Sequence, residues 1–212
     1  MQSLSLVIMS DPSFSQLLES LSAKTPAPGG GAAAAWAGAI GAALGEMAMR
    51  YSIRKKTPEA DRDEIASLIG ILGEFQQFFL QCAHADAEAY RALNRLQKLA
   101  ADDPVRMDGW DHAVSEAIAI PNGVIARAMT LLGRLESFTI KCNSWLLSDL
   151  AIAAILAEAA GRSAAWNVRV NMPLVDDEEK KKSMAARLAE DLDGMRVITA
   201  RIEAFCRESE AS

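Results

Sequence analysis

Residues 65–96 read IASLIGILGEFQQFFLQCAHADAEAYRALNRL, and this stretch decides the fold class. Its apolar side chains recur every three or four residues, as one face of a long α-helix requires. The positions on that face are Ile65, Leu68, Leu72, Phe75, Phe79, Cys82, Asp86, Ala89, Leu93 and Leu96. Similar helical patterns, separated by proline, glycine and charged breaks, cover the rest of the chain, and no run alternates convincingly as a strand would. The sequence therefore predicts an all-α fold, a single multihelical domain of long packed helices over residues 1–212.

Asp86 is the one carboxylate on that apolar face. Burying an ionised carboxylate without a partner is costly, so Asp86 needs a cationic partner, several hydrogen-bond donors or a raised pKa. Each of these arrangements is common at functional sites. The alternative is a structural carboxylate that caps a neighbouring helix or pairs with a cation on it.

The other helices begin and end at recognisable signals. A first helix is expected to begin at Ser10-Asp11-Pro12. Its inward side chains are expected to be Phe14, Leu17, Leu18 and Leu21. An alanine-rich second helix is expected to end near Lys55, and Thr57-Pro58-Glu59 to start the next one with a Thr cap. Later breaks or kinks are expected at Pro104, Pro121 and Pro173, and the last helix is expected to open with the acidic run that begins at Asp176.

Between the first two expected helices lies Thr25-Pro26-Ala27-Pro28-Gly29-Gly30-Gly31. The prolines hold Thr25 and Ala27 extended, and the three glycines expose backbone N–H groups that nothing local covers. If the alanine run that follows is helical, these amides and the positive end of the helix dipole form an anion or ligand cradle. The alternative is a loop that only starts a tightly packed helix. A Walker loop is disfavoured, since no Gly-Lys-Ser/Thr closes the turn.

Composition narrows the classes of function. The chain has 212 residues, a formal net charge of −6 and no long Lys/Arg block, so a nucleic-acid partner is not expected. The three cysteines are widely spaced and odd in number, which argues against a disulfide framework and favours a cytoplasmic location. His84 and His112 lack metal-ligand spacing, so no metal site is expected.

Two segments bear on membranes. Residues 1–10 lack a basic region and a sufficient apolar stretch, so no export signal is expected. Residues 29–49 are long enough to cross a bilayer, but they are mostly glycine and alanine and carry Glu46. We expect no membrane span; Gly41 and Gly45 would instead let another helix approach closely. The apolar faces exceed what one thin helical layer covers, which favours a homodimer.

A second polar set lies on the helical region that follows Cys142. Asp149 and Asn167 share a face but lie about 27 Å apart along a straight helix. One protomer therefore cannot place both on the same reacting atom. They must serve different ends of a long ligand, different protomers or different purposes. For Asn167 and Asn171 the alternative is backbone bonding at a helix terminus, and for Lys55-Lys56 it is a helix C-terminus favoured by its dipole.

Taken in order, these motifs resemble the formimidoyltetrahydrofolate cyclodeaminase and methenyltetrahydrofolate cyclohydrolase family. The resemblance is carried by Thr25–Gly31, Asp86-Ala87-Glu88-Ala89-Tyr90, Pro121, Asn143, Ser148-Asp149-Leu150 and Asn167-Val168-Arg169-Val170-Asn171. It implies an all-helical, typically dimeric protein that acts on folate-bound one-carbon units, with no cofactor beyond the tetrahydrofolate substrate. The chain departs from the family pattern at Gln97, where relatives carry proline, and at Arg50 and Arg54.

The resemblance implies one of two activities. A methenyltetrahydrofolate cyclohydrolase converts 5,10-methenyltetrahydrofolate and water into 10-formyltetrahydrofolate, and a formimidoyltetrahydrofolate cyclodeaminase releases ammonia. A non-catalytic folate-binding helical dimer is the third interpretation. An aspartate with a raised pKa suits either chemistry as base and acid, and the candidates are Asp149 and Asp86. The residues expected to bind substrate are Pro28, Gly29, Gly30, Gly31, Lys55, Lys56, Lys98, Asn143, Ser148 and Asn167.

Overall fold

The computed structural model describes residues 13–210, so the cap expected at Ser10-Asp11-Pro12 lies outside the described residues. Within that range the chain forms helices and no strand, which confirms the all-α prediction. The helices are α1 (Phe14–Ser22), α2 (Gly30–Ser52), α3 (Glu59–Gln97), α4 (Pro104–Phe138), α5 (Leu147–Asn171) and α6 (Glu178–Glu210). Short 3-10 turns η1 (Thr139–Lys141), η2 (Ser144–Leu146) and η3 (Met172–Leu174) flank α5.

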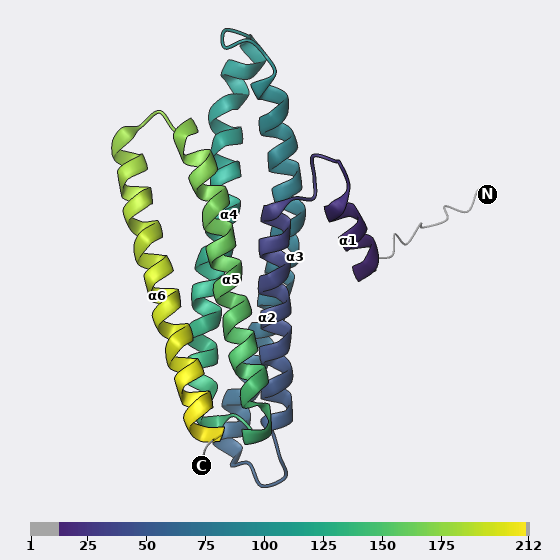
Figure 1. Ribbon diagram of the computed structural model, residues 1–212, viewed down its shortest axis with the longest axis vertical. Helices are drawn as coiled ribbons and strands as arrows, with labels where there is room; N and C mark the ends of the chain where they lie inside the picture. The colour runs from purple at the N-terminus through teal and green to yellow at the C-terminus, as the bar shows by residue number, and fades with distance from the viewer. Residues whose placement is uncertain (1–12, 211–212) are drawn as a thin grey trace, which may run out of the picture.

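Helices α2 to α6 form one elongated bundle (Figure 1). Helix α2 packs between α5 and α3, and α4 packs against α3, α5 and α6. At one end the hairpin of α3 and α4 extends beyond the other helices, and α2 begins well below its tip (Figure 1). The start of α2 therefore lies along the side of the bundle rather than at its end, and this position shapes the cavity described below.

The apolar face predicted on α3 is the centre of the core. Ile65, Leu72 and Phe79 are fully or almost fully buried, and eight of its ten positions are buried, with Asp86 and Ala89 half-buried. Helix α2 reaches this core through its glycines. A Cβ at Gly38 would lie 2.7 Å from the Phe79 ring, and one at Gly41 would lie 3.0 Å from the Ala153 carbonyl oxygen. The close helix approach predicted at Gly41 is therefore confirmed.

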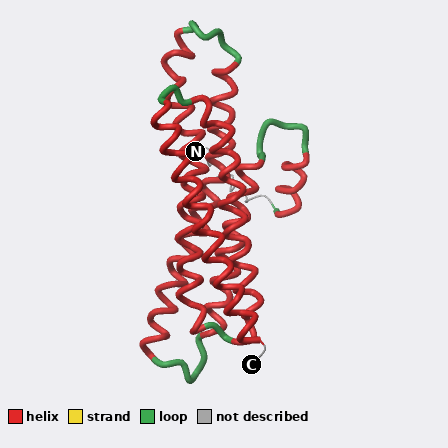
Figure 2. Tube along the Cα trace, turned by 60° about the vertical axis from the view of Figure 1, so that its left-hand side comes forward, coloured by secondary structure: helices red, strands yellow, loops and turns green. Residues whose placement is uncertain are grey.

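Helix α1 corrects one prediction. None of its residues is buried, and Phe14 and Leu18 are 63% and 50% exposed. The helix itself is well capped, since Ser13 accepts a hydrogen bond from the Gln16 N–H. However, the extended Pro26–Pro28 loop leads it away from the bundle, where it stands alone in both views (Figures 1 and 2). Its apolar side chains are therefore not buried by any part of the chain that the structure describes.

Two helix boundaries also differ from expectation. Helix α2 ends at Ser52 rather than near Lys55, because Ile53 is extended and Lys55 lies in the turn that follows. Pro58, not Thr57, is the N-cap of α3, and the Thr57 hydroxyl instead accepts a hydrogen bond from the Arg54 N–H. Pro121 sits inside α4 without ending it.

Three stretches of the described chain are long and apolar enough to cross a membrane, judged by length and composition alone. They are Gly30–Ser52, Glu59–Gln97 and Ser144–Leu174. In the bundle α2 packs against both of the other two helices. The expectation that residues 29–49 do not span a membrane stays a prediction.

Candidate functional site

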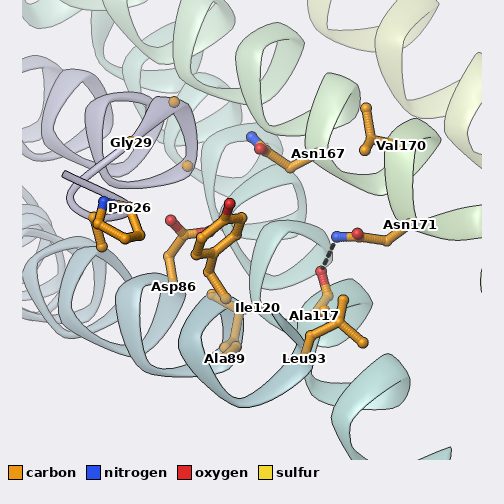
Figure 3. Close-up of a pocket in the computed structure, with 14 residues that line it drawn as sticks. Pro26, Gly29, Asp86, Ala89, Leu93, Ala117, Ile120, Asn167, Val170 and Asn171 are labelled. Atoms are coloured by element: carbon orange, nitrogen blue, oxygen red, sulfur yellow. Dashed lines mark hydrogen bonds between the residues drawn. The ribbon is translucent and has the colours of Figure 1, made fainter. Parts of the chain in front are cut away.

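A cavity of about 250 Å³ lies where α2 begins, enclosed by α2, α3, α4 and α5. The loop before α2 contributes Pro26 and Ala27, and the start of α2 contributes the three glycines. Asp86 and Tyr90 enter from α3, and Asn167 and Asn171 enter from α5. In Figure 3 the Asp86 carboxylate faces the start of α2, while Asn167 approaches from the opposite wall. The cavity thus unites three of the motifs that stand far apart in the sequence.

Asp86 lies directly against the N-terminus of α2. Gly29 is the N-cap of this helix and offers no side-chain hydrogen bond, and the Asp86 carboxylate takes that place by accepting the Ala32 N–H. Gly31 makes the approach possible, because a Cβ at this position would overlap the carboxylate. The Ala32 N–H at this helix start is therefore bonded to a carboxylate of the same chain, and the ligand cradle expected at the glycines stays a prediction.

The environment of Asp86 sets its protonation. Burial raises the pKa of the Asp86 carboxyl above its ordinary value, and the hydrogen bond from Ala32 lowers it by a smaller amount. Nearby, burial raises the pKa of the Cys82 thiol to about 11. Within the described residues no ion pair to Asp86 is found, so burial dominates. A carboxyl of this kind holds a proton more readily than an exposed aspartate and suits acid–base work.

Asn171 is a cavity residue whose role follows from Pro121. Proline has no N–H, so a proline inside a helix leaves the carbonyl four residues earlier without its helical donor. In α4 that carbonyl belongs to Ala117, and the Asn171 side-chain amide donates to it at 2.9 Å (Figure 3). The bond ties the end of α5 to α4 across one wall of the cavity. Backbone bonding of Asn171 was one of the two expectations from the sequence, but its partner on α4 was not predicted. The position of Pro121 could have indicated that partner.

The remaining polar side chains of the cavity make fewer contacts with other helices than Asp86 and Asn171 do. The Asn167 side-chain amide lies 3.4 Å from the Ser163 carbonyl oxygen of its own helix, so its oxygen is directed elsewhere. Tyr90 is half-exposed at the rim. Pro28 belongs to the same loop, but Pro26 and Ala27 line the cavity in its place. Tyr90, Pro26 and Ala27 were missed as site residues, although each belongs to a motif that carries the family resemblance.

A second group of predicted site residues lies at the other end of α5 and α2. Asp149 is in the first turn of α5, and Lys55 and Lys56 lie in the exposed turn after α2. Asn143 connects the two elements, since its N–H donates to the Ser52 hydroxyl at 2.9 Å and its side-chain oxygen accepts the Trp145 N–H. The adjacent Cys142 thiol has a pKa raised to about 12, chiefly by burial.

The predicted residues therefore form two groups and not one. The cavity group contains Gly29, Gly30, Gly31, Asp86 and Asn167. The distal group contains Lys55, Lys56, Asn143, Ser148 and Asp149. Lys98 belongs to neither, because it is exposed at the C-terminal end of α3. Among residues 13–210 no cluster of His, Cys, Asp and Glu side chains is arranged to hold a metal ion.

The fold is thus an all-helical bundle in which an aspartate lies against a glycine-rich helix start. The family model described as Formiminotransferase-cyclodeaminase matches residues 13–190, and the chain belongs to this family. The match covers the described bundle from α1 into α6.

Individual relatives agree with this assignment. A methenyltetrahydrofolate cyclohydrolase from Methylorubrum extorquens is 29% identical over 181 residues, covering 82% of this chain and 87% of the relative. The formimidoyltransferase-cyclodeaminase of Gallus gallus is 28% identical over 188 residues, and the chain spans only 35% of its length. The crystal structure of a formiminotetrahydrofolate cyclodeaminase from Thermotoga maritima superposes with a TM-score of 0.85 at 25% identity, covering 93% of this chain and 97% of that one.

Proposed function

We propose that this chain is a methenyltetrahydrofolate cyclohydrolase, which hydrolyses 5,10-methenyltetrahydrofolate to 10-formyltetrahydrofolate. The observation that carries the proposal is Asp86, a carboxyl with a raised pKa held at the wall of a cavity between a glycine-rich helix start and Asn167. The match to the Methylorubrum extorquens cyclohydrolase, which extends over 87% of that relative, supports the choice of reaction.

For this reaction the protein must supply a base and an acid and must position the substrate and the attacking water. In the substrate the reacting carbon belongs to a cationic amidinium that bridges two nitrogens. Water adds to this carbon while Asp86 accepts one of its protons, which gives a neutral carbinolamine. The bond from carbon to one ring nitrogen then breaks as Asp86 returns that proton to the nitrogen, and the hydroxyl loses its proton to solvent as the formyl C=O bond forms. The overall reaction releases one proton, because a cation becomes neutral. Since the electrophile already carries the charge, we propose that no cofactor beyond the folate takes part.

The second candidate is a formimidoyltetrahydrofolate cyclodeaminase, which the Thermotoga maritima structure favours. There a nitrogen of the folate itself attacks the same carbon and ammonia leaves. An acid that protonates the leaving nitrogen promotes this step, and the Asp86 carboxyl fits this role as well. The two candidates differ in the nucleophile and the leaving group but share the same carboxyl.

One experiment separates the candidates. Purified protein is mixed with 5,10-methenyltetrahydrofolate or with 5-formimidoyltetrahydrofolate, and methenyl absorbance and ammonia are followed. Loss of absorbance from the first substrate supports the cyclohydrolase, and a gain with ammonia release from the second supports the cyclodeaminase. Binding of both folates without turnover identifies a non-catalytic folate-binding protein and contradicts the proposal.

We also propose that the protein acts as a homodimer. Half of the large apolar side chains that are exposed in the described residues gather on α2, α5 and the turn before α5. Apolar side chains concentrated on one face typically mark an interface. Sedimentation analysis at micromolar concentration tests this directly.

A further inference from the structure

A groove between α5 and α6 lies apart from the cavity. It consists of two adjoining hollows of about 390 and 440 Å³, which share Arg162, Arg169 and Leu192. Small side chains leave this space open, because Ala159 lines it on α5 and Ala189 lines it on α6. Among residues 13–210, none lines both the groove and the cavity. Helix α6 runs alongside α5 (Figure 1), so the groove is a separate feature of the bundle surface.

Three arginines line the larger hollow, Arg162 and Arg169 from α5 and Arg196 from α6. Arg162 and Arg169 are seven residues apart, so they lie on the same face of α5 with about 10 Å between them along the helix. The two helices are in close contact at this level, since a Cβ at Gly161 would lie 2.4 Å from the Met195 sulfur. Arg162 and Arg196, the next residue on each helix, are therefore neighbours across the groove. The three guanidinium groups can thus approach one anion.

Arg169 carries a positive charge that no carboxylate balances. Within residues 13–210 no ion pair or hydrogen bond from its guanidinium is found, and the group instead lies over the Trp166 ring, with Cζ 5.1 Å from the ring centroid. Trp166 is 66% exposed, so this contact leaves both side chains accessible to solvent. Stacking of this kind leaves the N–H donors of a guanidinium available to a ligand.

The other two arginines bond only to carboxylates of their own helices. Arg162 pairs with Glu158 at 3.5 Å, and Arg196 pairs with Asp193 at 2.8 Å. The two arginine side chains are 68% and 72% exposed. Ion pairs between exposed residues three or four apart on one helix contribute little to stability. An anion of higher charge in the groove can therefore displace these carboxylates from the guanidinium groups at low cost.

We propose that this groove binds the phosphate group of a small molecule through Arg162, Arg169 and Arg196. A terminal phosphate carries a charge close to −2 and three strong acceptor oxygens, so guanidinium groups from two helices can donate to it at once. A carboxylate has one negative charge and two oxygens in one plane, which suits a single guanidinium better. The proposal goes beyond the folate reaction and does not rest on it.

Calorimetric titration of the full chain at low salt tests the site, with inorganic phosphate and adenosine monophosphate as the probes. We expect binding that weakens as salt rises, because the groove is exposed. Arg169→Gln and Arg196→Gln are each expected to weaken binding by about tenfold, since each removes charge-assisted hydrogen bonds. The matched control is Arg187→Gln, because Arg187 is an exposed arginine of α6 that faces Asp191 of its own helix and does not line the groove. Its affinity is expected to equal that of the wild type.

The outcomes separate the site from general charge attraction. Absence of binding at millimolar probe, or an equal loss in Arg187→Gln, overturns the proposal. Circular dichroism establishes that each variant is folded before it is titrated. If adenosine monophosphate binds more tightly than phosphate and Trp166→Ala removes the difference, the ligand is a phosphate ester with an aromatic body. Equal affinities that both depend on Arg169 and Arg196 assign the site to the free phosphate ion.

Discussion

Asp86 and Asp149 are two aspartates of one bundle whose positions have different physical causes. Asp149 occupies the first turn of its own helix, where free backbone amides and the helix dipole favour a carboxylate without any tertiary contact. Asp86 lies in the middle of α3 and finds its amide donor on another helix, at Ala32. The first is placed by local sequence and the second by packing. Packing also buries Asp86, and this burial raises the pKa of its carboxyl.

The largest expected effect is on Asp86 itself. We expect Asp86→Asn to lower turnover by about 10²–10⁴-fold, since amide replaces the group that accepts and returns the proton. Steady-state kinetics on the preferred folate measure this. A rate within a few fold of wild type would show that Asp86 is not the acid–base group. It would also remove the functional contrast between Asp86 and Asp149.

The same variant carries a stability control with a defined sign. The folded-state pKa of Asp86 is raised, so its carboxyl stabilises the fold fully below the unfolded pKa and loses that contribution as pH rises through the folded pKa. We therefore expect wild type to lose thermal stability relative to Asp86→Asn as pH rises from about 4 towards neutral. Equal melting temperatures across that range would contradict the burial argument.

The next effect concerns the glycine that admits Asp86. In Gly31→Ala the new Cβ must displace the carboxylate, and we expect a loss of about 1–3 kcal/mol in the free energy of unfolding together with reduced turnover. Gly30→Ala is the matched control, because a Cβ at Gly30 meets nothing within 4 Å. Urea unfolding compares the two. Equal behaviour of both variants would show that Asp86 does not depend on the bare helix start.

A smaller effect is expected at the hydrogen bond between Asn171 and Ala117, which joins α5 to α4 at one wall of the cavity. Removing the amide in Asn171→Ala leaves the Ala117 carbonyl without a donor, and we expect a loss of about 1–3 kcal/mol in unfolding free energy. Pro121→Ala restores a backbone N–H four residues after Ala117. In the Pro121→Ala background, Asn171→Ala should therefore lower the free energy of unfolding by less than it does in the wild type. A double-mutant cycle in urea measures the difference, and strict additivity would refute the coupling.

The smallest effect lies at the distal end. Ser52→Ala removes the hydroxyl that accepts the Asn143 N–H at 2.9 Å, and we expect a loss of about 1 kcal/mol with the pKa behaviour of Asp86 unchanged. Thr130→Ala removes a hydroxyl that bonds only within its own exposed helix turn and serves as the control. If Ser52→Ala were as stable as that control, the tie between α2 and the start of α5 would be dispensable.

The success of sequence reasoning depended on whether the cause of a feature was local. The buried face of α3 could be read from periodicity, because a core helix must repeat its apolar side chains every three or four residues. Periodicity misled for Phe14 and Leu18, which have the spacing of a buried face but remain exposed among residues 13–210. Pairing of Asp86 with Ala32 needed the crossing of α2 and α3, which periodicity does not encode. The separation of Asp149 from Asn167 could be predicted because helix length is local, but the meeting of Asp86, Tyr90 and Asn171 at one cavity depends on how α3, α4 and α5 pack.

The bare start of α2 has a consequence for how the cavity can evolve. Gly29 to Gly31 present only backbone atoms, so this wall has no rotamers and cannot adapt its shape to a different ligand. Tyr90 and Asn167, on the facing helices, are the positions where a substitution changes cavity size or polarity without disturbing a helix terminus. Among relatives with different reactions, we therefore expect substitutions that change substrate preference to occur on the wall with Tyr90 and Asn167. The wall formed by Gly29 to Gly31 is expected to stay the same.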